Sequence, residues 1–61
     1  MAHMRDEVLA LVQVEYPDAY DVSEVHPGSD REWWVVAGDQ STFAFAWFDE
    51  ADAFNVRPYK P

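Results

Sequence analysis

The side chains that could do chemistry in this sequence are two histidines, a few hydroxyls and twelve carboxylates, with no cysteine among them. The serine and threonine hydroxyls are Ser23, Ser29, Ser41 and Thr42. No hydroxyl stands in the strand-to-helix turn that exposes a catalytic nucleophile. His26 is the plausible general base, but it precedes Pro27-Gly28, a sequence typical of a turn. Carboxylate pairs such as Glu24 with Glu32 arise by chance among so many acids, so we expect no catalytic residues and no enzyme activity.

Metal and cofactor sites find little support either. His26 has Glu24 and Asp30 nearby, but zinc draws on several nitrogen, sulfur or carboxylate ligands, which these residues do not supply. The acidic run Asp49–Asp52 lacks the glycine and the terminal glutamate of a calcium loop. The two glycines lie well apart, so no glycine-rich loop could cradle a phosphate. We expect neither a metal nor a cofactor.

The charge balance points to a protein partner. The net charge is -8, and the four basic residues are scattered, which disfavours nucleic-acid backbones and anionic membranes. Six carboxylates between the predicted helix end and the second strand would give a negative field that attracts a basic protein surface. They are Glu15, Asp18, Asp21, Glu24, Asp30 and Glu32. The alternative is that they only keep an aromatic-rich chain in solution.

Length and composition favour one small folded domain. The chain has 61 residues, of which 16% are aromatic, far more than a disordered segment usually carries. No apolar run approaches the roughly 18–20 residues that cross a bilayer, and no export signal is evident, so we expect a cytoplasmic protein. Residues 1–3 resemble a cloning remnant, which leaves residues 4–61 as the domain. Alanine-rich composition with more arginine than lysine suggests a bacterial or phage origin.

Hydrophobic spacing predicts a helix followed by strands. Apolar residues from Met4 to Tyr16 recur on one helical face, and Pro17 ends that helix. Strands are expected over residues 20–26, 32–37 and 41–48, with turns at Pro27–Asp30 and Gly38–Gln40. A short fourth strand over 53–57 stays open. The prediction is an α+β fold with an N-terminal helix on a three-stranded antiparallel meander, or on four strands.

Both faces of that sheet read as apolar. With a loop of two or four residues at Gly38, Trp34, Val36, Phe43, Phe45 and Trp47 share one face, and Trp33, Val35, Ala44, Ala46 and Phe48 share the other. With a loop of three residues, Trp33 and Val35 would change faces with Trp34 and Val36. We expect the helix to cover the larger aromatic face. The second set would then be an interface, unless the C-terminal segment folds back over it through Phe54, Val56 and Tyr59.

The resulting hypothesis is a non-enzymatic protein–protein interaction module that self-associates, as a homodimer in its simplest form. A domain this small has little stability to spare, and association would add to it. The alternative is an acidic decoy or inhibitor that binds the basic surface of a nucleic-acid-binding protein. No motif in the sequence identifies a family.

Overall fold

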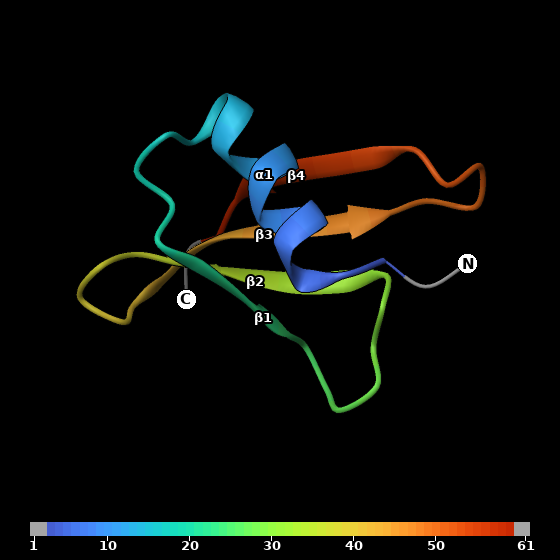
Figure 1. Ribbon diagram of the computed structural model, residues 1–61, viewed down its shortest axis with the longest axis horizontal. Coiled ribbons are helices and arrows are strands. Elements are labelled where there is room, and N and C mark those ends of the chain that lie inside the picture. Colours follow the sequence, from blue (N-terminus) through green and yellow to red (C-terminus); the bar gives the residue numbers. More distant parts are fainter. Residues whose placement is uncertain (1–2, 60–61) are drawn as a thin grey trace.

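The structure is a computed structural model that describes residues 3–59. One helix, α1 (Arg5–Glu15), precedes four strands: β1 (Asp21–Glu24), β2 (Glu32–Val36), β3 (Thr42–Phe48) and β4 (Phe54–Pro58). The strands form one antiparallel sheet in the order β1-β2-β3-β4, with α1 packed on one face (Figure 1). The predicted α+β fold is confirmed, and the fourth strand is present. Lys60 and Pro61 lie outside the described residues.

Helix α1 is stabilised by the burial of one of its faces. Val8 and Val12 are fully buried, and acidic Asp6 and Glu7 lie in the first turn, where negative charge suits the exposed backbone amides. The last helical hydrogen bond runs from the N–H of Tyr16 to the carbonyl of Val12, at 2.8 Å. The helix ends there because Pro17 disfavours the helical conformation at the residue before it. Met4, predicted to lie on this face, is 70% exposed, because it precedes the first helical residue.

Strand β1 is a short strand at the edge of the sheet, shorter than the predicted range of 20–26. Val22 is its one buried residue, and it pairs with Val35 of β2. The connection to β2 contains a turn in which the N–H of Ser29 donates to the carbonyl of His26 at 2.9 Å. Gly28 has φ 82° at the third position, which is the requirement of a type II turn after Pro27.

The β2–β3 hairpin combines a three-residue loop with a bulge. The N–H of Ala37 donates to the carbonyl of Ser41 at 2.8 Å, and Gln40 closes the loop with φ 72°. Such a loop alone would place Phe43 opposite Val35. The register instead shifts between Val35 and Val36, so that Ala44 lies opposite Val35. Beyond the bulge, the strands therefore pair as they would after a loop of two or four residues, with Trp34 opposite Phe45.

The β3–β4 turn is organised by Asp49. Its carboxylate accepts hydrogen bonds from the N–H groups of Ala51 and Ala53 at 2.9 and 3.0 Å, and Asp52 has φ 63°. Strand β4 then pairs with β3, with Phe54 opposite Phe48 and Val56 opposite Ala46.

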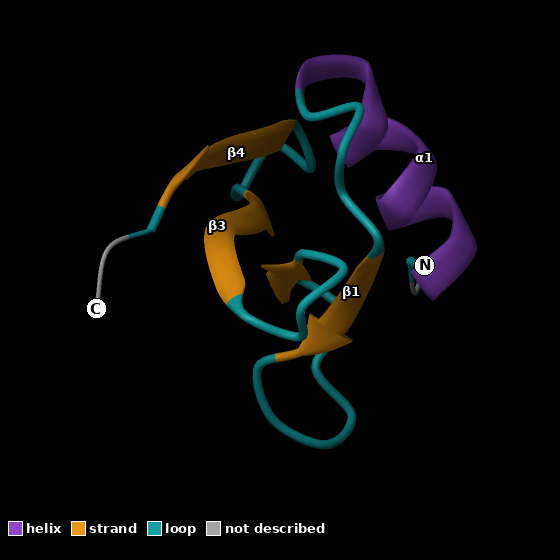
Figure 2. Ribbon diagram, turned by 90° about the vertical axis from the view of Figure 1, so that its left-hand side faces the viewer, coloured by secondary structure: helices purple, strands orange, loops and turns teal. Residues whose placement is uncertain are grey.

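The core lies between α1 and the face of Trp33, Val35, Ala44, Ala46 and Phe48. The sheet curves toward the helix, which occupies one side of it (Figure 2). The expectation that the helix would cover the larger aromatic face is wrong. The small Ala44 and Ala46 leave room for Trp33, Phe48 and the helix residues Val8 and Val12 to share one buried cluster, in which interlocking side chains leave few voids.

Candidate functional site

The five residues predicted as an interface lie inside the molecule. Trp33, Val35, Ala44, Ala46 and Phe48 are each at most 6% exposed, beneath α1. They form the monomer core and present no surface to a partner, which corrects the predicted choice of face. The alternative was that the C-terminal segment covers this face. Part of it does, because Phe54 and Val56 pack against this core from β4.

The opposite face of the sheet, which we call the open face, carries a continuous aromatic cluster. The ring of Trp34 lies 5.1 Å from that of Tyr59 and 5.2 Å from that of Phe45, and Phe45 lies 5.7 Å from Trp47. We call Trp34, Phe45, Trp47 and Tyr59 the open-face cluster. Two strands and the segment after a third supply it, since Trp34 is on β2, Phe45 and Trp47 are on β3, and Tyr59 follows β4. The prediction that Trp34, Phe45 and Trp47 share a face holds in this structure.

The sequence predicts Phe43 on the face of Trp34 and Phe45, but Phe43 lies on the helix side of the sheet. Its ring packs edge-on against Tyr16 at the end of α1, 5.8 Å away, on the helix side of the sheet. The bulge that separates Val35 from Val36 in the register is the cause, because the extra residue of a bulge leaves the regular alternation.

One cation lies at the margin of the open-face cluster. The guanidinium carbon of Arg57 stands 5.7 Å from the centre of the Trp47 ring, within cation–π range. Arg57 is on β4, at the sheet edge opposite to β1. The open face therefore combines aromatic rings with an arginine, the residue types that concentrate binding energy at protein interfaces.

The six carboxylates predicted to form an acidic surface follow one another along the segment 15–32, which contains edge strand β1 (Figure 1). Four are exposed and two, Asp21 and Asp30, are half-buried. Asp21 pairs with Arg5 at 2.6 Å, and Glu32 lies 4.0 Å from His26. Within residues 3–59, Glu15, Asp18, Glu24 and Asp30 form no ion pair.

The candidate chemical groups are spread over the surface. His26 has a side chain that is 66% exposed, and its ionic neighbour is Glu32. Among the described residues, no three histidine or acidic side chains come together as a metal site would require. Ser41 donates to the carboxylate of Asp39 at 2.6 Å, a contact that holds the pKa of Asp39 below its usual value and shapes the β2–β3 loop.

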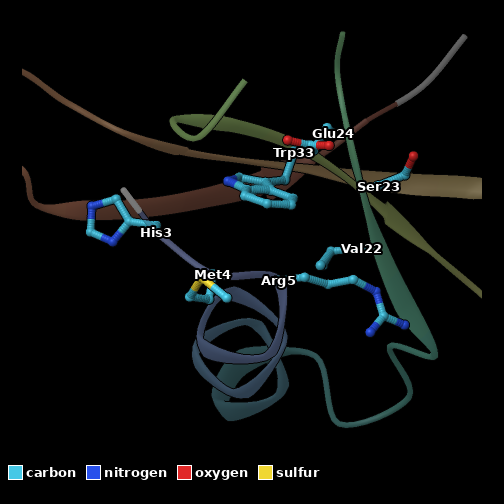
Figure 3. Close-up of a pocket in the computed structure, with 7 residues that line it drawn as sticks. All are labelled: His3, Met4, Arg5, Val22, Ser23, Glu24 and Trp33. Carbon is cyan, nitrogen blue, oxygen red and sulfur yellow. The ribbon is translucent and has the colours of Figure 1, made fainter. Parts of the chain in front are cut away.

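His3 belongs to the three residues that the sequence analysis set aside as a cloning remnant. Its imidazole stacks on the ring of Phe48, with centroids 3.6 Å apart and planes inclined by 1°. It borders a cavity of about 410 Å³ beside the start of α1, with Val22, Glu24 and Trp33 among the other lining residues (Figure 3). The Nε1 atom of Trp33 is buried and has no hydrogen-bond partner within residues 3–59.

Comparison with protein-family models, with curated proteins and with solved structures gives no match. Within the described residues, no helix is both long and apolar enough to cross a membrane.

Proposed function

We propose that this protein is a non-enzymatic protein–protein interaction module that binds a second copy of itself through the open-face cluster. The observation that carries this proposal is the chain of ring contacts from Tyr59 through Trp34 and Phe45 to Trp47, on the sheet face opposite α1. An antiparallel sheet with one packed face normally turns polar side chains outward on the other. Aromatic side chains in that position are better suited to an interface.

Apolar burial would supply the binding energy. Each large aromatic ring that leaves water contributes about 25 cal/mol for every Å² of apolar surface buried. These rings already contact one another in the monomer, so little side-chain freedom remains to be lost on association. Tryptophan and tyrosine are also the residues most often found at interface hot spots.

The charges of the molecule favour a second copy as the occupant. Arg57 lies on the β4 edge of the sheet, whereas Asp21 lies on the β1 edge, next to buried Val22 and therefore on the side away from α1. A twofold axis parallel to the strands would place β4 of one copy over β1 of the other. Arg57 would then approach an acidic edge twice in the same dimer, as a symmetric interface requires.

Solution mass measured by light scattering, at low and at high salt, tests the proposal. A dimer that persists at high salt supports binding by apolar burial, because screening weakens interactions between exposed charges. A monomer at both salt concentrations, up to millimolar protein, contradicts it.

The acidic segment favours a second candidate function, that of an acidic ligand for a basic protein surface. Its support is the run of exposed carboxylates on residues 15–32, several of which have no ion pair within the described chain. Charge reversals at Asp18 and Asp21 would abolish binding of such a partner, and raised salt would slow association. Binding that is insensitive to salt would contradict this function.

A further inference from the structure

His3 lies in a recess built by three separate elements. Its ring is stacked on Phe48 at the end of β3, and its Nε2 atom lies 2.8 Å from the carboxylate of Asp52 in the β3–β4 turn. Its Nδ1 atom lies 3.3 Å from the carboxylate of Glu7 in the first turn of α1. The side chain is only 12% exposed, although His3 belongs to no helix or strand.

We propose that Phe48, Asp52 and Glu7 form a receptor site for an arginine side chain of a partner protein, which His3 occupies in this chain. The recess offers an aromatic face for a flat cation and a carboxylate at each of two ring edges. A guanidinium is planar, stacks on aromatic rings and directs its N–H donors in the plane of the group. The compact ammonium of lysine can satisfy only part of this arrangement.

The electrostatics of the recess suit a cation. Asp52 and Glu7 both contact His3, the guanidinium of Arg31 lies 3.7 Å from Asp52, and Arg5 lines the adjoining cavity. The hydrogen bond from His3 to Asp52 is the main cause that raises the pKa of His3. The carboxylate side chains are 50% and 58% exposed, so an incoming side chain can reach them from solvent.

A second observation points to a peptide as the carrier of the cation. The indole nitrogen of Trp33 is a buried donor without a partner in the described chain, and it lies at the end of the ring that faces His3 (Figure 3). Such a group normally pairs with an acceptor. A backbone carbonyl beside the bound arginine would supply one. The adjoining cavity of about 410 Å³ has room for that backbone.

The site is separate from the open-face cluster, because Phe48 and Trp33 lie on the helix side of the sheet. Its test is therefore independent of self-association. The His3→Ala variant of the full chain vacates the recess. N-acetyl-arginine amide and N-acetyl-lysine amide are then titrated into it, and NMR follows the Phe48 ring and the Trp33 indole N–H.

We expect saturable binding of the arginine amide, at least about tenfold tighter to His3→Ala than to the wild type, in which the tethered His3 competes. Asp52→Asn or Glu7→Gln in the His3→Ala background should weaken binding several-fold. Glu50→Gln, in the same turn as Asp52 and exposed, is the matched control and should leave binding unchanged. Equal binding of the two amides, absence of saturation, or equal affinities of the Asp52→Asn and Glu50→Gln variants would overturn the proposal.

Discussion

Trp33 and Trp34 are consecutive in β2 but belong to opposite sides of the molecule. The side chain of Trp33 is 3% exposed beneath α1, whereas the Trp34 ring stands on the open face, 5.2 Å from Phe45. Alternation along a strand produces this separation. The two tryptophans therefore provide a matched pair that separates the stability of the monomer from the binding of a partner.

Replacing Trp33 by alanine should destabilise the fold severely. Removal of a buried tryptophan costs about 3–5 kcal/mol, which is most of the stability expected for so small a domain. Trp34→Ala should cost less than half as much, because its ring is only half-buried. Urea unfolding of dilute protein, where association is negligible, measures both values. Equal losses for the two variants would contradict the assignment of the faces.

Replacing Trp47 by alanine should weaken self-association. Loss of a central aromatic anchor is expected to raise the dimer dissociation constant at least about tenfold. Tyr20→Ala is the control, since Tyr20 is 63% exposed and lies outside the open-face cluster. Sedimentation equilibrium gives both constants. If the Tyr20 variant weakened the dimer as much as the Trp47 variant, the interface would lie elsewhere.

Replacing each of the two glycines by alanine should change the stability of the protein differently. Gly28 has φ 82°, a region in which an L-residue costs about 1–2 kcal/mol, so Gly28→Ala should lower the free energy of unfolding by that amount. Gly38 has no such φ, and open space surrounds its Cβ position. Gly38→Ala should therefore be neutral or stabilising by up to about 1 kcal/mol. Thermal unfolding of both variants tests this contrast, and a more harmful change at Gly38 would contradict it.

Acid should weaken the β3–β4 turn through Asp49. The backbone N–H of Ala53 is the main cause that holds the pKa of Asp49 below its ordinary value. The stabilisation is thus present above the unfolded pKa of about 3.9 and is lost as the pH falls through the lower folded value. Asp49→Asn keeps an acceptor oxygen but does not titrate. The melting temperature of the wild type should fall more steeply in acid than that of the variant, and parallel curves would contradict the prediction.

His3 should stabilise the fold more in acid than in alkali, which is opposite to the effect of Asp49. Its pKa is raised, mainly by the hydrogen bond to Asp52. Its contribution is therefore complete below the unfolded pKa of about 6.5 and is lost as the pH rises through the folded value. The stability difference between the wild type and His3→Ala should be larger in mild acid than in mild alkali. A difference that does not change across this range would show that His3 makes no ionic contact in solution.

Much of the fold could be predicted from local patterns, because those patterns have local causes. The helical stripe around Val8 and Val12, the stop at Pro17 and the turn at Gly28 each depend on a few neighbouring residues. The acidic segment was equally visible, since charge needs no fold to be counted. His3 was set aside with residues 1–3 as a cloning remnant, and its environment could not be foreseen because Glu7, Phe48 and Asp52 are far apart in the chain.

The sequence by itself determined the α+β class, the order of the elements and the presence of two apolar faces on one sheet. Only the tertiary structure decided which face the helix covers and which residues each face contains. The bulge at Phe43 reset the register of β3, and Val8 and Val12 were buried in one cluster with Ala44 and Ala46, on the face with the smaller aromatic area. Both outcomes depend on how three-dimensional shapes fit together, a property that residue types and spacing do not express.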